Sequence, residues 1–438
     1  MRIGIRREDK NEWEKRVPLS PSQVKELLGS NDLEVCVQPS EIRIFPNDSY
    51  SDAGAALTED LSSCKVVFSI KEIPADLFQR SGTYVFFSHT IKGQDYNMPM
   101  LARLMELGCN LIDYERIVDE VNRRLILFGK EAGWAGMIDS LWALGRRLDW
   151  KGVENPYSAI KQAIRYKDLE EAKEEIRKVG RTIREQGLPS HLCPVVFGFA
   201  GYGNVSQGAQ EVLDCLPVES VAPQDLASLG GGREKWARAV LKVVFKEEHI
   251  VRSISEDVTF ELQDYYDHPE KYGPAFERFA PHLTVLVNCI YWNKMYPRLI
   301  TKGYLKKSFQ SDTQLKLEVI GDISCDIGGA IECTVKCSDT GDPLFVYDPL
   351  TGEAQDGVQG RGVVVLAVDN LPAELPAESS TNFGGVLLGL IPSIVHADYR
   401  KGFDDLDLPP EVKRALIVHN GELTPDYRYL HKFLNRHD

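Results

Sequence analysis

The chain has 438 residues, which is too long for one ordinary hydrophobic core, so we expect two domains. Its 43% hydrophobic and 26% charged residues are typical of a soluble globular protein. A formal net charge of -14 argues against nucleic acid and anionic membrane surfaces as partners. Apolar runs stay shorter than the roughly 18–20 residues of a membrane span, and the N-terminus enters a strand pattern too early for a signal peptide. The nine scattered cysteines indicate reduced thiols, so we predict a cytoplasmic protein.

The first third of the chain alternates short apolar runs with helical patterns. The predicted strands are residues 2–6, 33–37, 66–70, 84–88 and 110–114. Ser20 and Pro21 open a helix as its cap and its first residue, and residues 98–107 form another. The runs 66–70 and 84–88 are continuously apolar, as strands buried on both faces are. This alternation predicts a parallel, doubly wound α/β sheet.

The middle of the chain begins with a mainly helical region, 131–191. One apolar stripe recurs within it at spacings of three and four residues: Leu169, Ala172, Ile176, Val179 and Ile183. Gly187 and Pro189 end that helix. A buried strand at 195–199 follows, and a second alternating sheet continues through 284–287, 317–321 and 362–368.

The remaining segments are predicted from turn residues and short helical patterns. Gly230, Gly231 and Gly232 indicate a surface loop, followed by an inserted helical segment. After Pro372 we expect a proline-rich turn, a helix around 383–396 and a helical C-terminal tail. The fold class that follows is α/β, with two Rossmann-like doubly wound sheets.

A glycine-rich turn lies between the buried strand at 195–199 and the helix after it. Gly201 and Gly203 would let the backbone turn tightly and bring its N–H groups close to a pyrophosphate. The N-terminus of the following helix adds favourable partial charge. Ser206 stands at the third glycine position of the GxGxxG pattern, and Gly208 comes two residues later. A plain strand–helix turn is the alternative, but the strand before and the helix after favour a dinucleotide site.

The cofactor should be distinguished at the end of the second strand of this sheet, which we place near Val221. NAD-specific sites carry an acid there for the ribose hydroxyls. Glu219 comes before that point and Asp225 after it, so the missing acid favours NADP(H). No arginine stands there to hold a 2′-phosphate, and both NAD and NADP therefore remain candidates.

Four ionisable residues follow strands of the first sheet: Arg16, Lys71, His89 and Glu115. The carboxyl ends of parallel strands share one edge, where open α/β sheets bind ligands, so we expect these residues to meet. Each alone is typical of a solvated loop. Glu14 and Arg124 lie near them, and these acids and arginines could instead form structural ion pairs. Together the residues favour a catalytic site.

The second sheet offers Asp322 at the end of its predicted strand 317–321. Paired glycines, Gly328 and Gly329, follow it, which suits a loop that closes over a nicotinamide. A simple Asx-turn is the alternative. Three cysteines come close together in the sequence beyond it: Cys325, Cys333 and Cys337. They lack an accompanying histidine or a second CxxC pair, so we predict no metal site.

Several motifs are specific enough to indicate a family. Those of the first sheet are Ile5-Arg-Arg-Glu-Asp9, Trp13-Glu-Lys-Arg16 and Phe86-Phe-Ser-His-Thr-Ile-Lys92. Those of the second are Gly201-Tyr-Gly-Asn-Val-Ser206, Asn288-Cys-Ile-Tyr-Trp292, Asp322-Ile-Ser-Cys-Asp326 and Asp369-Asn-Leu-Pro372. Over essentially the whole chain the sequence resembles the lysine–2-oxoglutarate reductase half of bifunctional aminoadipate semialdehyde synthases. The likeness extends to lysine-forming saccharopine dehydrogenases and alanine dehydrogenases.

The resemblance implies a reaction and a domain arrangement. The reaction is the NADP(H)- or NAD(H)-dependent condensation of L-lysine with 2-oxoglutarate to saccharopine, or its reverse. The fold would be two Rossmann-like domains with the active site in the cleft between them. Residues 1–130 and 371–438 would form the substrate and catalytic domain, and 131–370 the dinucleotide-binding domain. The second, glutamate-forming dehydrogenase of the bifunctional relatives is expected to be absent.

The resemblance also assigns roles to the residues of the first sheet. Lys71 and His89 match the catalytic base and acid, and Arg16 matches a ligand of a substrate carboxylate. The formation and reduction of an imine need two proton-transfer groups, and a lysine can serve only if burial or nearby cations lower its pKa. A histidine already titrates in the useful range.

Substrate and cofactor ligands complete the expected site. Saccharopine carries three carboxylates, so Lys92 and Arg124 are candidates beside Arg16. Glu14 and Glu115 could hold the lysine ammonium. The expected cofactor ligands are Gly201, Gly203, Asn204, Val205, Ser206, Ile290 and Asp322.

Two other functions compete with the lysine-linked reductase. One is a related amino-acid or opine dehydrogenase that acts on a different amine or keto acid. The other is a non-catalytic sensor that binds a nicotinamide dinucleotide. Lys71 and His89 together argue against the sensor, because a sensor needs no proton-transfer pair. Small-molecule substrates are the expected partners, and a homo-oligomer is compatible with the sequence.

Overall fold

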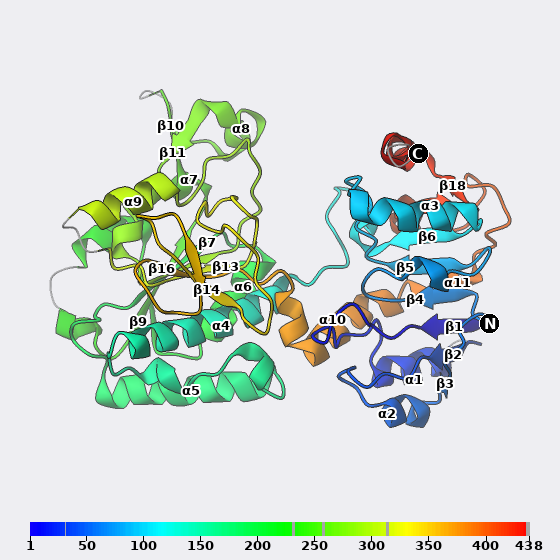
Figure 1. Ribbon diagram of the computed structural model, residues 1–438, viewed down its shortest axis with the longest axis horizontal. Helices are drawn as coiled ribbons and strands as arrows, with labels where there is room; N and C mark the ends of the chain where they lie inside the picture. The colour runs from blue at the N-terminus through cyan, green and yellow to red at the C-terminus, as the bar shows by residue number, and fades with distance from the viewer. Residues whose placement is uncertain (31, 230–232, 256–258, 312–314, 435–438) are drawn as a thin grey trace. The chain divides into compact units, whose positions relative to one another are not determined.

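Each of two units of the chain is built around one eight-stranded sheet flanked by helices, as the computed structural model shows (Figure 1). Unit 1 comprises Met1–Phe128 and Pro376–Asp438, and unit 2 comprises Gly129–Leu375. The structure describes residues 1–30, 32–229, 233–255, 259–311 and 315–434. Parallel strands alternate with helices in both units, which confirms the predicted α/β class with doubly wound, Rossmann-like sheets.

The sheet of unit 1 is parallel except at one edge. Its strands are β1 (Arg2–Ile5), β2 (Glu34–Val37), β3 (Ala56–Leu57), β4 (Val66–Phe68), β5 (Thr83–Phe86), β6 (Asn110–Asp113), β17 (Leu416–His419) and β18 (Glu422–Leu423). They lie in the order β18-β17-β6-β5-β4-β1-β2-β3. β17 pairs antiparallel with β6, and β18 pairs antiparallel with β17. The prediction of a helical tail is therefore wrong for 416–423, because so short an apolar run has no readable period.

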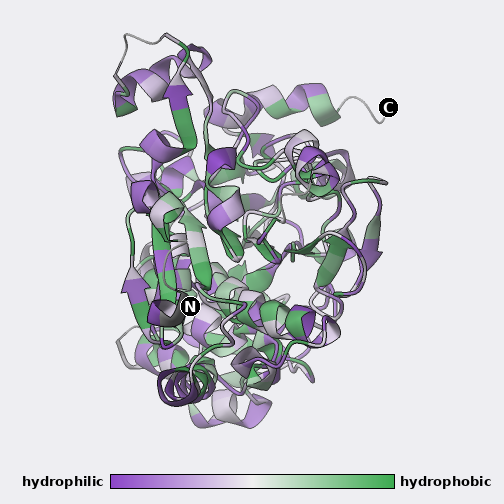
Figure 2. Cartoon of the chain, turned by 90° about the vertical axis from the view of Figure 1, so that its left-hand side faces the viewer, coloured by the Kyte–Doolittle hydropathy of each residue, from purple (hydrophilic) through white to green (hydrophobic). Residues whose placement is uncertain are grey.

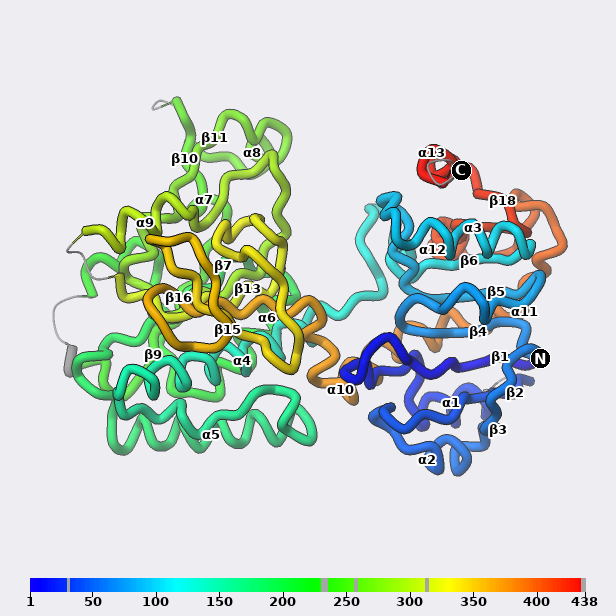
Figure 3. Tube along the Cα trace, viewed as in Figure 1, coloured from blue at the N-terminus to red at the C-terminus, as the bar shows by residue number. Residues whose placement is uncertain are grey.

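Helices cover the sheet of unit 1. They are α1 (Pro21–Ser30), α2 (Asn47–Asp52), α3 (Met98–Glu106), α10 (Pro376–Leu388), α11 (Ile391–His396), α12 (Pro410–Arg414) and α13 (His431–Leu434). The helix predicted around 383–396 starts earlier, at Pro376, and is interrupted before Ile391. Pro392 fits the first turn of α11 but would disrupt a helix interior. The trace in Figure 3 shows both ends of the chain, blue and red, within unit 1.

The sheet of unit 2 likewise has a parallel body and an antiparallel edge. Its strands are β7 (Val196–Ala200), β8 (Val218–Ser220), β9 (Val240–Phe245), β12 (Val285–Asn288), β13 (Val319–Asp322), β14 (Leu344–Tyr347), β15 (Ala354–Asp356) and β16 (Val363–Leu366). Their order is β15-β14-β16-β13-β12-β7-β9-β8. β14 and β15 form the antiparallel edge. A separate hairpin joins β10 (Val251–Ser253) and β11 (Tyr272–Pro274).

The strand beside β7 is β9, not β8. β9 pairs with β7 from Val196 opposite Leu241 to Ala200 opposite Phe245, and β8 lies outside β9 at the edge. β9 is mostly buried, whereas the residues of β8 are half-buried or exposed, and a strand in the sheet interior must be apolar on both faces. A strand does end near Val221, as predicted, but it is not the one that pairs with β7 on this side of the sheet. The neighbouring strand ends at Phe245.

The helices of unit 2 include the long apolar-striped helix predicted from the sequence. They are α4 (Gly129–Trp150), α5 (Leu169–Gln186), α6 (Asn204–Leu213), α7 (Glu247–Ile250), α8 (Leu262–Asp267) and α9 (Lys302–Gln310). All five residues of the predicted stripe are buried along α5. Asp168 accepts from the Glu171 amide (2.9 Å) and caps this helix, which Gly187 ends at a φ of 80°. The predicted loop at 230–232 lies outside the described residues.

Hydrophobic residues concentrate on the strands and on the inner faces of the helices, as the green colouring in Figure 2 shows. Each unit therefore has its own buried core. Within the described ranges, no helix is long and apolar enough to cross a membrane.

Two buried carboxyls connect the first helix of unit 2 to its last segment. Asp139 lies on α4, and Glu374 lies on the short 3-10 helix Leu371–Glu374. Their exposed fractions are 0% and 1%. Burial and then the nearby charge of Asp139 raise the pKa of Glu374 well above its ordinary value, and burial also raises the pKa of Asp139. A protonated Glu374 can thus donate a hydrogen bond to Asp139.

This pair makes the stability of unit 2 depend on pH. Because both pKa values are raised in the folded state, the contribution of this pair to stability is fully present below the ordinary carboxyl pKa of about 4 and is lost as the pH rises above it. Glu374→Gln keeps the shape and removes one titrating group. We expect the free energy of unfolding to rise by about 1–2 kcal/mol at pH 8 and to change little at pH 5. Urea unfolding at the two pH values measures this; an equal loss at both would contradict the pH dependence.

Candidate active site

The strand order of unit 1 gathers the predicted site residues at one edge of its sheet. The strands β6, β5, β4 and β1 are neighbours in that order. The segments that follow them carry, respectively, Glu115, His89, Lys71 and Arg16. All four segments leave the carboxyl ends of parallel strands, which is the edge where such sheets bind ligands.

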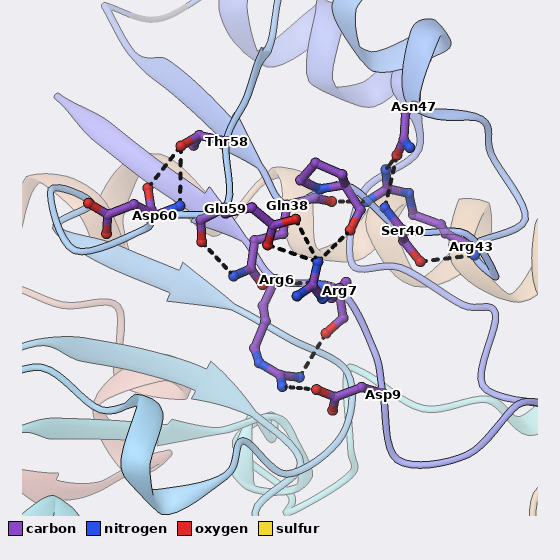
Figure 4. Close-up of polar contacts among 11 residues, drawn as sticks. Arg6, Arg7, Asp9, Gln38, Ser40, Arg43, Asn47, Thr58, Glu59 and Asp60 are labelled. Carbon is purple, nitrogen blue, oxygen red and sulfur yellow. Dashed lines mark hydrogen bonds and ion pairs between the residues drawn. The ribbon is translucent and has the colours of Figure 1, made fainter.

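A polar network anchors the loop after β1 (Figure 4). Arg6 donates to the carbonyl of Arg7 (2.7 Å) and pairs with Asp9 at 2.5 Å. Arg7 donates to Glu59 (3.0 Å), beyond β3, and to the carbonyl of Pro39 (3.1 Å), beyond β2. The loop is therefore fixed against the ends of neighbouring strands.

A cavity of about 580 Å³ opens beside this network. Its wall contains five acids and one arginine: Glu8, Asp9, Glu12, Glu41, Glu59 and Arg7. The excess of negative charge favours a cationic group over an anion in this cavity.

Glu8 holds the backbone that presents Lys71. Its buried side chain accepts from the amides of Ile70 (2.6 Å) and Lys71 (3.0 Å) and from the hydroxyl of Ser69 (2.8 Å). Burial, and next the charge of Arg16, lower the pKa of Lys71. The lysine therefore meets the condition set by its proposed role, because a depressed pKa makes the neutral amine accessible as a base.

His89 is oriented by Glu72. The Nδ1 atom of His89 lies 2.7 Å from Glu72 Oε1, and Lys10 Nζ donates to Glu72 Oε2 at 2.9 Å. Burial alone would raise the pKa of Glu72, but the hydrogen bonds from His89 and Lys10 outweigh it and hold that pKa well below its usual range. An ionised Glu72 accepts a hydrogen bond from the Nδ1–H group of His89, which leaves Nε2 of the half-exposed ring for proton transfer.

The turn that carries His89 is held from two sides. His89 has a φ of 49°, in the left-handed region that non-glycine residues rarely adopt. Asn97 donates through Nδ2 to the carbonyls of Ser88 (2.9 Å) and His89 (3.3 Å). The buried Asp113 accepts from the Ser88 amide (3.1 Å) and from its hydroxyl. Such strain persists only where the surroundings enforce it, and it is concentrated at functional sites.

The acids and arginines of this edge form the ion pairs that the sequence left open. Arg16 and Glu14 make a buried bidentate pair, with N–O distances of 2.7 and 2.6 Å. The Arg16 guanidinium also lies 4.4 Å from the centre of the Phe128 ring. Arg124 pairs with Glu115. Lys92 is exposed on the segment after His89. A substrate carboxylate at Arg16 would therefore share the guanidinium with Glu14.

In unit 2, the glycine-rich turn connects β7 to α6. Gly201 has a φ of 94°, which requires glycine, and its amide donates to the Phe245 carbonyl at 3.0 Å. Gly203 immediately precedes α6. Apart from Gly203 itself and its two chain neighbours, no described residue has an atom within 4 Å of the place a Cβ would take on Gly203. The fold itself does not require glycine there, but the close approach of a phosphate to the backbone would, so the turn fits a dinucleotide.

Gly208 explains the departure from the GxGxxG spacing. A Cβ on Gly208 would lie 2.3 Å from the Lys130 carbonyl, and one on Gly133 would lie 2.0 Å from the Val205 carbonyl. α4 and α6 therefore touch backbone to backbone. Ser206 is buried at the third glycine position and accepts from Gln210 (3.0 Å). The close-packing role of the third glycine is thus taken by Gly208, with Asn204 and Val205 in the first turn of α6.

Gly203 and Gly208 give a matched test. Gly203→Ala is expected to weaken dinucleotide binding by roughly 10–100-fold, about 1.4–2.7 kcal/mol, because the methyl group enters the space of the phosphate. Its stability should change by less than about 1 kcal/mol. Gly208→Ala should instead cost about 1–3 kcal/mol of stability through overpacking. Titration of dinucleotide binding and urea unfolding measure the two effects; unchanged affinity in Gly203→Ala would contradict the assignment of the turn.

Asp322 is the last residue of β13, which β12 separates from β7 and its glycine-rich turn. It is 1% exposed, and its oxygens accept from Asn288 Nδ2 (2.8 Å) and the Thr334 hydroxyl (2.5 Å). Burial raises its pKa to about 6. The following Ser324 donates to the Ile290 carbonyl at 2.6 Å. Asp322 thus organises the loop after β13 rather than presenting a carboxylate to solvent.

Ile290 reaches the turn itself. Its Cγ2 atom lies 2.9 Å from the place a Cβ would take on Gly201. The ends of β7, β12 and β13 therefore converge at one edge of unit 2. Among the described residues, no three His, Cys, Asp or Glu side chains gather in a way that could hold a metal ion.

Sequence reasoning missed Glu8 and Glu72 as site residues. Both follow strand ends at the same edge as the predicted residues, so the signal that pointed to Lys71 and His89 also covered them. Glu8 falls within the quoted motif Ile5-Arg-Arg-Glu-Asp9. What the sequence did not contain was the pairing, because Glu8 contacts residues 61–63 positions away and Glu72 contacts His89 17 positions away.

Two family models match the chain. The alanine dehydrogenase/PNT N-terminal domain matches residues 4–135, and the alanine dehydrogenase/PNT C-terminal domain matches residues 285–426. An L-alanine dehydrogenase structure superimposes with a TM-score of 0.63 at 19% identity and covers 99% of this chain and 100% of that one. This similarity supports the fold alone.

Curated relatives give a more specific likeness. The α-aminoadipic semialdehyde synthase of Arabidopsis thaliana is 38% identical over 98% of this chain and 41% of its own length. The mitochondrial enzyme of Bos taurus is 35% identical over 98% of this chain and 47% of its length. The saccharopine dehydrogenase [NAD(+), L-lysine-forming] of Emericella nidulans is 25% identical over 88% of this chain and 90% of its length.

The chain spans about half the length of the semialdehyde synthases that it matches. The two domain models together cover more than half of this chain, and the relatives match nearly all of it. The chain therefore belongs to the alanine dehydrogenase/PNT family and is similar to the α-aminoadipic semialdehyde synthases.

Proposed function

We propose that the chain is a nicotinamide-dependent oxidoreductase that interconverts L-lysine plus 2-oxoglutarate and saccharopine. The observation that carries the proposal is the pair of proton-transfer groups at one edge of unit 1. Lys71 has a lowered pKa there, and His89 is oriented by an ionised Glu72. The names and identities of the relatives support the lysine-linked reaction.

The proposed chemistry divides between the two units. Unit 1 would hold the substrate, and the glycine-rich turn of unit 2 would hold the dinucleotide. A nicotinamide dinucleotide supplies the hydride that reduces the imine formed from amine and keto acid. Neutral Lys71 would accept a proton from the substrate ammonium, which frees the amine to attack the keto acid, and His89 would donate a proton from Nε2 to the hydroxyl group that leaves as water. Glu8 and Glu72 are positioning residues, since they act through the backbone of Lys71 and the ring of His89.

The charges of the edge suit a substrate with both signs. Arg16, Arg124 and Lys92 supply positive charge for carboxylates. Glu14 and Glu115 partly neutralise these arginines and remain candidates for an ammonium group. The acidic cavity beside the β1 loop offers a further place for a cation.

We propose NADP(H) as the preferred cofactor. The corrected strand order places Lys246 directly after β9, and its Nζ atom lies 6.0 Å from the centre of the Tyr202 ring in the glycine-rich turn. Glu247, the next residue, is engaged by the Tyr266 hydroxyl at 2.9 Å. An exposed cation at this strand end is suited to a 2′-phosphate.

The cofactor assignment makes its own prediction. Lys246→Ala should weaken NADPH binding by roughly tenfold, about 1.4 kcal/mol, and leave NADH binding nearly unchanged, because only NADPH carries the 2′-phosphate. Fluorescence titration with each dinucleotide measures the two dissociation constants. An equal change for both would remove Lys246 from the discrimination.

The reaction is tested by incubating the protein with NADPH or NADH, 2-oxoglutarate and a panel of amines. Lysine-dependent oxidation of the nicotinamide, with saccharopine identified by mass, is the expected result. Oxidation with another amine would favour the alternative amino-acid or opine dehydrogenase. Dinucleotide binding without turnover on any amine would favour the sensor.

Location and assembly belong to the same proposal. We propose a cytoplasmic location, which the nine scattered cysteines support because reduced thiols are typical of that compartment. The bovine relative, in contrast, is named mitochondrial. Fractionation of cells that express the protein distinguishes the two, and sedimentation determines whether it forms a homo-oligomer.

A further inference from the structure

Two thiols of unit 2 lie close together after strand β13. Cys325, in the loop after β13, and Cys337, twelve residues later, have their sulfur atoms 3.2 Å apart. Cys325 Sγ also donates to the Ala367 carbonyl at 2.9 Å. A disulfide needs the sulfur atoms to approach to about 2.05 Å, so a shift of roughly 1 Å would join them.

Exposure sets the order in which the two sulfurs would react. Cys337 is exposed, whereas Cys325 is half-buried and Cys333, between them, is buried. A dissolved oxidant therefore reaches Cys337 first, and Cys325 is the neighbour that can resolve the product. Burial raises the pKa of both thiols, so the reaction should be faster at alkaline pH.

The two cysteines belong to segments that meet at Asp322. The Cys325 amide donates to the Asp322 carbonyl (3.1 Å), and Thr334, three residues before Cys337, donates to the Asp322 carboxylate. Cys325 also has a φ of 54°, so its backbone is already in the strained left-handed region. The positions of the two sulfurs are therefore coupled to the loop after β13.

That loop is linked by contacts to the glycine-rich turn. Ser324, next to Cys325, donates to the Ile290 carbonyl at 2.6 Å. Ile290 in turn packs against Gly201, with its Cγ2 atom 2.9 Å from the place of a Cβ there. A displacement of Cys325 is thereby transmitted through two neighbouring side chains to the turn that would hold the phosphates.

We propose that Cys325 and Cys337 form a reversible disulfide under oxidation by a small disulfide such as oxidised glutathione, and that this bond weakens dinucleotide binding. The Cys337 thiolate attacks one sulfur of glutathione disulfide, and one glutathione leaves as a thiolate that takes up a proton. The Cys325 thiolate then attacks the mixed disulfide and releases the second glutathione. Two protein thiols are oxidised, and one glutathione disulfide is reduced to two thiols.

The effect on binding has a structural cause. Forming the bond removes the hydrogen bond from Cys325 to Ala367 and pulls Cys325 toward Cys337. Ser324 then loses its fixed position at Ile290. We expect the dissociation constant for the dinucleotide to rise about 3- to 10-fold on oxidation and to return on reduction, which corresponds to about 0.7–1.4 kcal/mol. This second part rests on the proposed function, whereas the disulfide itself does not.

The test uses the full chain, incubated with oxidised glutathione and then digested without reduction. The expected result is a linked pair of peptides that contain Cys325 and Cys337, two hydrogens lighter than the separate peptides. Cys337→Ser should abolish the link. Cys215→Ser changes a half-buried cysteine just after α6 and should leave the link intact. Stable glutathionylation of Cys337 without the link would overturn the proposal.

Dinucleotide affinity is measured on the same samples by fluorescence titration with NADPH and NADH. A loss of affinity on oxidation that appears in the unsubstituted protein and in Cys215→Ser, but not in Cys337→Ser, is the expected result. An equal loss in Cys337→Ser, or a link without any loss, would overturn the effect on binding. If the reduced protein binds neither dinucleotide but the link still forms, the proposed function fails and the modification site stands.

Discussion

Lys71→Met is expected to lower turnover by roughly 10²–10⁴-fold while leaving dinucleotide affinity nearly unchanged. The substitution keeps a flexible apolar stem of similar length and removes the amine. Glu8 still accepts from the amides of Ile70 and residue 71, so the backbone of the site remains in place. The loss should therefore appear in the chemical step. Steady-state assays with lysine and 2-oxoglutarate measure it, and dinucleotide titration provides the separate readout.

The matched control is Lys25→Met, at an exposed lysine of α1. It removes the same amine from the same unit without approaching the sheet edge, so turnover should stay within about twofold, as is usual for surface substitutions. Near-full turnover in Lys71→Met would rule out its proton-transfer role. A loss confined to substrate affinity would instead indicate that the lysine binds rather than transfers a proton.

His89→Gln is expected to have an effect of similar size, again roughly 10²–10⁴-fold on turnover. Glutamine can still reach Glu72 with its amide, but it has no group that takes up and releases a proton near neutral pH. The pH profile is the decisive measurement. If His89 is the acid, the limb of the profile that it causes should disappear in the variant, whereas a purely structural role would lower the whole profile.

Glu72→Gln keeps the imidazole ring of His89 but removes the carboxylate that orients it. The new amide can donate to Nδ1 of His89, which disfavours the doubly protonated ring that can donate a proton from Nε2. Turnover should fall although the histidine remains. Unchanged turnover would show that the 2.7 Å contact between Glu72 and His89 does not orient the ring for catalysis.

The fold could be predicted largely because its parallel strands are short and continuously apolar. The runs ending at Phe68 and Phe86 are buried at every position, as expected for strands that helices cover on both faces. Prediction failed at sheet edges. β17 pairs antiparallel with β6, about 300 residues earlier in the chain, and β14 pairs antiparallel with β16, which follows it. Likewise, nothing local distinguishes β8 from β9 as the neighbour of β7.

The site could be predicted as a set of positions but not as a set of partners. The rule that parallel strands share a carboxyl edge was enough to select Lys71, His89 and Glu115. The rule gave no information on where each side chain points. Asp322 was therefore expected at the nicotinamide, although its side chain points inward to Asn288 and Thr334. A buried carboxyl of this kind is visible only once its neighbours have been placed in space.

The antiparallel pairing of β17 with β6 has a consequence for synthesis of the protein. Unit 2 is one continuous stretch of chain, so the ribosome delivers all of it before it delivers β17. Until then β6, which leads directly into Glu115, is an open edge strand with free backbone groups, about 300 residues ahead of its partner. Unit 2 can therefore fold first, and the proposed catalytic edge is completed last, so a nascent chain already able to bind dinucleotide would still lack a finished substrate site.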